Sequence, residues 1–229
     1  MVSRKLTRSV VVGATALAVA GGSYGIVSAA SSSTPAAASS GSAGGPGPGG
    51  GGSNARSGGA SGTVGSLSTS GFTMTTSAGQ KVTVKDGSAT TYQKGTSPAT
   101  ASAITAGEPV LVLGMASGTT ITAIQVIVQP AGGGSGASPA ATVIPFQRGA
   151  PATSRQAGQV PASYRQGSGT IVSGTAADKA TEAALAAYPG GVVDRVVKLS
   201  NGEYEVHYIG VNWPHHVFGN QDFKVIGAE

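Results

Sequence analysis

The sequence contains no cysteine, which excludes a disulfide scaffold, a thiolate metal site, a cysteine nucleophile and a lipid-modified cysteine. Charged residues make up only 10% of the 229 residues and aromatic residues only 5%, whereas 38 residues are glycine. Such a composition leaves much of a chain unpacked, because there are few large side chains to fill a core. We therefore expect small folded modules of about 60 to 70 residues rather than one large core.

The net charge of +5 is not gathered on a folded surface. Arg4, Lys5 and Arg8 lie in the N-terminal leader, and three arginines lie in a Pro/Ala/Gly-rich stretch. Residues 169–229 hold seven acids and four bases and are therefore acidic. Binding to phosphates needs lysine and arginine clustered on one face, so we expect no nucleic-acid partner.

Residues 1–30 have the three parts of an export signal. A cationic start precedes an apolar run from Val10 to Ala20, and the small residues Ser28 and Ala30 suit cleavage. Because the apolar run continues weakly beyond Ala20, a retained membrane anchor is the alternative to a cleaved signal peptide. In both cases we predict an extracytoplasmic protein, secreted or tethered to the cytoplasmic membrane, that contacts the membrane only through this segment.

Two stretches rich in glycine, alanine and serine, residues 31–62 and 130–168, are predicted to be disordered linkers. They hold too few apolar side chains to offset the entropy of ordering the backbone. The second contains a short apolar island at Val143, Ile144 and Phe146. This island either docks on a neighbouring module or is a stray hydrophobic patch.

Residues 63–129 show the alternation of short strands. Phe72 and Met74 alternate with threonines, a turn follows, and Val82 and Val84 alternate with polar residues, which predicts a hairpin with one buried face. The run "VLVLG" indicates a strand covered on both faces. Several short strands with glycine-rich turns favour a small all-β barrel or sandwich.

The order of motifs in this segment resembles a bacterial extracytoplasmic domain of unknown function, DUF5666. The similarity lies in "ITAGEPVLVLG" and in the strand after it, "TTITAIQVIV". The matching positions are strand and turn residues: Ile104, Gly107, Val110, Val112, Gly114, Thr120, Ala123 and Val126. The resemblance implies a small β-barrel and supplies no catalytic residue.

Residues 169–229 are predicted to form a small α+β module, one helix packed on an antiparallel meander. Within "GTAADKATEAALAAYPGG", Thr175 with Asp178 resembles a capping box, and Pro189 ends the helix. Apolar residues at helical spacing form the stripe that faces the sheet. These residues are Ala177, Ala180, Ala184, Leu185 and Tyr188.

The meander is predicted from four strands and one clear turn. Asn201-Gly202 is a strong hairpin signal. Before it, Val193, Val197 and Leu199 are expected on one face of a strand with Arg195 at its middle. In the returning strand we expect Tyr204, Val206 and Tyr208 on one face and Glu203, Glu205 and His207 on the other. The remaining strands are expected around His216 and Phe218, and around Phe223 and Val225.

This layout resembles the PepSY family, from "GTAADKATEAALAAYPGGVVDRV" through "EYEVHY" to "HHVFGNQDFKVIGAE". PepSY modules occur in propeptides of secreted metallopeptidases and in envelope proteins. The resemblance implies restraint of a secreted peptidase, or binding of a peptide. The loop "GVNWPHHVFGN" adds Trp213, Pro214 and His215 to the shortest family pattern, so a surface for an exported protein or peptide partner is expected there.

The histidines of the chain, His207, His215 and His216, fall within ten residues of one another. If the strands through His207 and His216 pair, their imidazoles meet on the polar face next to Glu203 or Glu205, a ligand type that suits zinc or copper. Adjacent strand residues point to opposite faces, so His215 and His216 are not expected to share a metal. Ordinary surface histidines are the alternative.

Trp213 is either an exposed binding anchor or a cap on a small core. The pair Glu203 and Glu205 lacks the cleft that glycosidase carboxylates need, and no nucleophile elbow or phosphate loop is present. We therefore predict a monomeric, non-enzymatic binding or regulatory protein without a cofactor. The alternatives are a structural spacer of the cell envelope and a histidine-based metal binder.

Overall fold

The computed structural model describes residues 55–130, 143–150 and 155–229. The predicted export signal and residues 31–54 lie outside the described residues. Within the described part the chain is mostly β-strand, with one α-helix, which confirms a mixed, β-rich fold. None of the helices in the described ranges has the length and apolar character that crossing a membrane requires.

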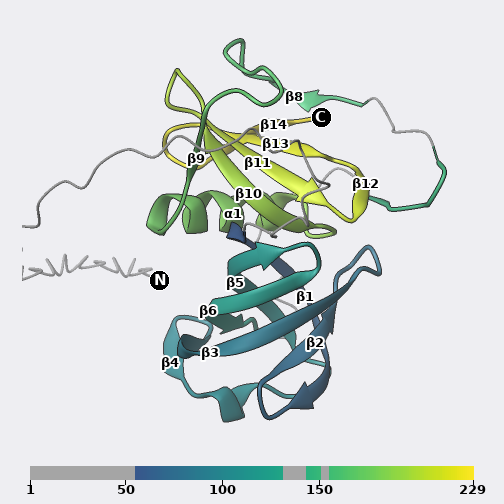
Figure 1. Cartoon of the computed structure of the whole chain (residues 1–229), viewed down its shortest axis with the longest axis vertical. Coiled ribbons are helices and arrows are strands. Elements are labelled where there is room, and N and C mark those ends of the chain that lie inside the picture. The colour runs from purple at the N-terminus through teal and green to yellow at the C-terminus, as the bar shows by residue number, and fades with distance from the viewer. Residues whose placement is uncertain (1–54, 131–142, 151–154) are drawn as a thin grey trace, which may run out of the picture. The chain divides into compact units, whose positions relative to one another are not determined.

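The N-terminal strands pair in a circuit that returns to its starting strand. β1 pairs with β2, β2 with β3, β3 with β6, β6 with β5, and β5 again with β1. The bounds are β1 (Arg56–Ser68), β2 (Gly71–Thr75), β3 (Lys81–Lys94), β4 (Ser97–Ala99), β5 (Pro109–Ser117) and β6 (Thr120–Val128), with a 3-10 turn at Ala101–Ala103. Figure 1 shows these strands curving around one another.

The apolar alternation of the predicted hairpin produces the core of this part. Phe72, Met74, Val82 and Val84 are all buried, which confirms the predicted buried face. They pack with Val110 and other apolar residues of β5 and β6 in one cluster. Burial of alternate residues from every strand stabilises the circuit of pairings.

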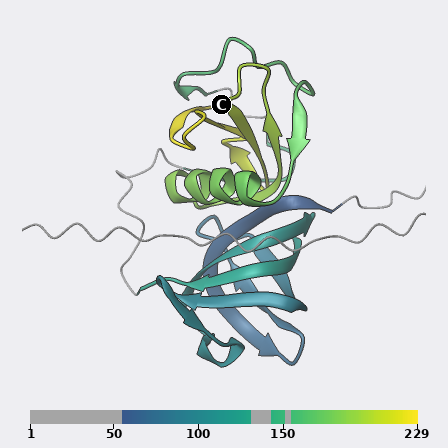
Figure 2. The ribbon, with the colours of Figure 1, turned by 90° about the vertical axis from the view of Figure 1, so that its left-hand side faces the viewer.

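The C-terminal part is one helix against an antiparallel sheet (Figures 1 and 2). The elements are β9 (Thr170–Val172), α1 (Thr175–Ala187), β10 (Val192–Lys198), β11 (Tyr204–Ile209), β12 (Val211–Trp213), β13 (His216–Gly219) and β14 (Val225–Ala228). The predicted helical stripe is buried against the sheet, with Ala177, Ala184 and Leu185 at most 2% exposed. Alanine on this face lets the helix approach the strands closely.

Two local details of this part differ from the sequence prediction. The residue before the helix is Gly174, and no side chain caps the helix, because Thr175 is already its first residue. In β10 the pairing with β11 shifts register between Val193 and Arg195, which is a β-bulge. The bulge interrupts the alternation, so Val193 lies in the core beneath the helix, whereas Val197 is paired with Glu205 and shares its face of the sheet.

β1 also pairs with β10, which joins the N-terminal strands to the C-terminal sheet. Gly59 lies opposite Val193 and Ala60 opposite Val192. Leu111 of β5 belongs to the same apolar cluster as α1. Residues 56–62, predicted as linker, are therefore part of a strand, because glycine allows the backbones of β1 and β10 to come close.

The described residues of the second predicted linker lie against the C-terminal sheet. β7 (Ile144–Pro145) pairs with β12, and β8 (Ala157–Gly158) pairs with β14. Val143 and Ile144 of the apolar island pack on the core, whereas Phe146 is 58% exposed. The apolar island therefore docks on the C-terminal core.

We refer to residues 155–168 as the strap, because this segment crosses the sheet from β14 to β9 (Figure 1).

Candidate functional site: a histidine and carboxylate cluster

The face of the sheet that α1 does not cover carries a cluster of imidazoles and carboxylates. His207 of β11 lies directly opposite His216 of β13, and their ring centroids are 5.1 Å apart. This pairing confirms the expectation that the strands through His207 and His216 are neighbours. Both side chains are partly buried, with 17% and 12% exposure.

Each of these imidazoles is held by a carboxylate through the same ring nitrogen. Nδ1 of His207 lies 2.5 Å from Oδ1 of Asp194, and Nδ1 of His216 lies 2.7 Å from Oε1 of Glu205. Glu205 is only 3% exposed, and a buried carboxylate needs such a partner. The bulge in β10 accompanies the turn of Asp194 toward His207, and Arg195 lies 3.6 Å from the other oxygen of Asp194.

His215 completes a group of three imidazoles. Its ring centroid lies 6.5 Å from that of His207 and 6.4 Å from that of His216. His215 is at a bend before β13, so the strand alternation used to predict its direction relative to His216 does not apply to it. Partial burial of the ring lowers the pKa of His215, and the neighbouring His207 and His216 lower it further.

The strap forms one wall of the cluster through Tyr164. Its ring lies 5.4 Å from that of His216 and meets Phe218 edge to face at 4.8 Å. Burial raises the pKa of Tyr164, and the carboxylates of Glu205 and Glu229 raise it further. Tyr164 therefore stays a neutral phenol that covers the His216 side of the cluster.

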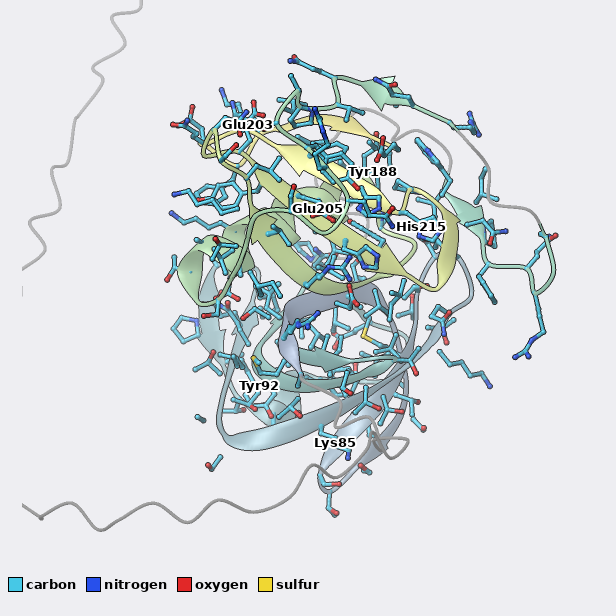
Figure 3. All side chains as sticks on the ribbon, turned by 45° about the horizontal axis from the view of Figure 1, so that its top comes forward. Lys85, Tyr92, Tyr188, Glu203, Glu205 and His215 are labelled. Atoms are coloured by element: carbon cyan, nitrogen blue, oxygen red, sulfur yellow. The ribbon has the colours of Figure 1, made fainter. Side chains whose placement is uncertain are left out.

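Trp213 and Glu203 do not belong to the cluster. Trp213 is 2% exposed, meets Tyr188 edge to face at 5.5 Å, and donates from Nε1 to the carbonyl of Arg155 at 2.9 Å. It caps the core and holds the strap, so it is not an exposed anchor. Glu203 accepts from the amide of Asn201 at 2.6 Å in the hairpin turn, away from His215 in Figure 3.

Sequence reasoning thus found four members of the cluster and missed two. His207, His215, His216 and Glu205 come together. Asp194 was missed because a bulge leaves no clear sequence signal, and Tyr164 was missed because it lies in a stretch with a linker composition. Across residues 55–130, 143–150 and 155–229, no group of three or more His, Cys, Asp or Glu side chains has an arrangement that could hold a metal ion.

In the part of the chain that the structure describes, the fold is β-rich with one α-helix, and one face of its C-terminal sheet carries the histidine and carboxylate cluster. Comparisons with protein families, with curated proteins and with solved structures found no match to this chain. The resemblances to DUF5666 and to PepSY modules stay predictions.

Proposed function

We propose that this chain is a non-enzymatic, extracytoplasmic binding or regulatory protein that engages a secreted peptidase or a peptide through its C-terminal part. The leader supports export, and the PepSY-like order of elements supports the class of partner. The observation that carries the proposal is the way the strap binds the edge of the C-terminal sheet.

The strap adds a short strand to the edge strand β14. Ala157 lies opposite Ala228, Gly158 lies opposite Gly227, and the amide of Gln159 donates to the carbonyl of Ile226 at 2.8 Å. Recognition of an extended peptide by an exposed sheet edge uses the same backbone hydrogen bonds. Because β8 has only two residues, few hydrogen bonds hold it on β14, and an extended peptide of greater length competes with it for this edge.

We also propose two modules, a small barrel at residues 63–129 and a PepSY-like module at residues 169–229. The circuit of strand pairings from β1 back to β1 supports the barrel. In this proposal the β1–β10 pairing holds the modules together, and the barrel orients the C-terminal module on its tether. A rigid spacer of the cell envelope is the second candidate, because the same pairing joins both parts in one sheet.

The experiment exploits the absence of cysteine. Ala157 and Ala228 are cross-strand partners, and both are replaced by cysteine in the chain without its leader, residues 31–229. Directly opposed residues of antiparallel strands lie close enough for a disulfide, so oxidation locks the strap on β14. The oxidised and the reduced protein then serve as bait for proteins of the culture supernatant and of the cell envelope.

We expect the reduced form to retain an exported protein or peptide that the oxidised form does not retain. The wild-type chain, tested with and without reductant, is the matched control. Equal retention by the oxidised and reduced forms would refute recognition through the β14 edge. If neither form retains a partner, the spacer is the better description of the protein.

A further inference from the structure

We propose that His207 and His216 form a two-histidine site for a divalent transition metal such as Zn²⁺ or Cu²⁺, on the sheet face opposite α1. The two residues are direct cross-strand partners in β11 and β13. This inference does not depend on the proposed peptide binding, because the metal site lies on the face of the sheet and the peptide would bind its edge.

The separation of the two rings fits a shared metal. Imidazole nitrogens bind zinc at about 2.0 to 2.1 Å, and two rings at a tetrahedral angle then have centroids about 5.2 Å apart. The observed distance is 5.1 Å, with the ring planes inclined by 63°. Binding of one ion by both imidazoles therefore requires the side chains to rotate until both Nε2 atoms face it, while the ring separation stays as observed.

The two carboxylates select which ring nitrogens are free. A carboxylate accepts from a protonated Nδ1, so Asp194 and Glu205 leave Nε2 of each imidazole with its lone pair. Metal-binding histidines usually donate their other nitrogen to a carboxylate in this way, which fixes the ring and increases its basicity. Glu205 is buried, so its position relative to His216 is well constrained.

The site is open and needs further ligands from elsewhere. His215 lies 6.4 to 6.5 Å from the other two rings, too far to bind the same ion without moving. In the proposed site, water would supply the remaining coordination positions. Asp194 and Glu205 contact Nδ1 atoms, and Arg195 neutralises part of the charge of Asp194, so we assign none of these three as metal ligands.

The alternative to a metal site is that the pairs of His207 with Asp194 and His216 with Glu205 only stabilise the sheet. Titration of residues 31–229 with Zn²⁺ or Cu²⁺ in a calorimeter at pH 7.5 distinguishes the two. The variants are His207→Gln, His216→Gln and His215→Gln, each checked by circular dichroism for an unchanged fold. A fourth variant carries all three substitutions. Because the chain has three histidines, this variant measures all metal binding that does not involve imidazole.

We expect one ion per chain with a dissociation constant in the micromolar range. His207→Gln and His216→Gln should each weaken binding at least tenfold, and His215→Gln should weaken it less. Asp194→Asn should weaken it about tenfold, as loss of a carboxylate behind a ligand usually does. With Cu²⁺, the electron paramagnetic resonance spectrum should show coupling to at least two nitrogens in the wild type and to fewer in His216→Gln.

Two results would overturn the proposal. One is binding that the His207→Gln and His216→Gln variants retain unchanged. The other is a dissociation constant above the millimolar range for both metals, which leaves the cluster as a pair of structural ion pairs. Because circular dichroism checks that each variant is folded, neither result can be attributed to unfolding.

Discussion

Replacing Gly58 with alanine tests whether the pairing of β1 with β10 holds the two parts of the chain together. A Cβ atom at Gly58 would lie 2.0 Å from the carbonyl oxygen of Val193 and 2.8 Å from its carbonyl carbon. These atoms belong to the backbone of β10, so no side-chain rotation relieves the contact. We expect β10 to move away from β1.

The energetic cost follows from the contacts that this separation breaks. The pairing consists of two residue pairs, Gly59 with Val193 and Ala60 with Val192. Each backbone hydrogen bond contributes about 0.5 to 1.5 kcal/mol net. Separation also relieves the overpacking, so we expect the free energy of unfolding to fall by about 1 to 3 kcal/mol, the sum for two such bonds.

The assay is urea denaturation followed by two probes. Trp213, the one tryptophan of the chain, reports on the C-terminal core through its fluorescence, and far-ultraviolet circular dichroism reports on all strands. The two transitions should coincide in the wild type and separate in Gly58→Ala, because the N-terminal strands then unfold independently. We also expect the circular dichroism transition of Gly58→Ala to have a lower urea midpoint than that of the wild type.

Gly65→Ala is the matched control on the same strand. Its Cβ atom would lie 3.0 Å from the hydroxyl of Thr73, an exposed side chain that can rotate. If Gly58→Ala unfolds with the midpoint of Gly65→Ala and with coincident transitions, the reasoning from the β1–β10 contact is wrong.

Three further predictions test the core, the strap and an ionisable group. Trp213→Ala should lower the free energy of unfolding by about 3 to 5 kcal/mol, because a fully buried indole is removed, and thermal denaturation measures the loss. Tyr164→Ala should speed amide hydrogen exchange in residues 155–168 while leaving β11 protected; unchanged exchange in the strap would show that the contacts of Tyr164 with His216 do not hold it. Burial raises the pKa of Tyr92 from 10.0 to about 12, with smaller contributions from the hydrogen bond with Asp86 and from the negative charge of Asp86. The folded state therefore disfavours the phenolate, so the stabilising contribution of the neutral phenol is present below pH 10 and is lost as the pH rises toward about 12. The difference in absorbance titration at 295 nm between the wild type and Tyr92→Phe measures this pKa, and a midpoint near 10 would contradict the prediction.

The parts of the fold that depend on neighbouring residues could be predicted from the sequence. Alternating apolar residues gave the buried positions of β2 and β3, and helical spacing gave the buried stripe of α1. Asn201-Gly202 marks the turn between β10 and β11, where the amide of Leu199 donates to the carbonyl of Glu203. The register of this hairpin and its neighbour then places His207 opposite His216.

The parts that depend on distant backbone contacts could not be predicted. Gly58 and Gly158 lie in stretches whose glycine-rich composition predicts a disordered linker. In the structure, each of these glycines lies against the backbone of another strand. At Gly158 a Cβ atom would lie 2.3 Å from the carbonyl oxygen of Ile226, so glycine at this position reflects the close approach of two strands. Composition alone does not distinguish these two reasons for glycine.

The bulge at Asp194 relates the junction to the candidate site. On one side of it, Val192 and Val193 pair with β1, and on the other side Arg195 pairs with His207. In a regular strand Val193 and Arg195 would share a face, which would place a guanidinium under the helix. The extra residue instead keeps Val193 in the core and lets Asp194 bind His207 on the polar face. Strand β10 can therefore place Val193 in the apolar core and Asp194 against His207 only because its register shifts at this point. A strand with regular alternation would provide one of these two contacts but not both.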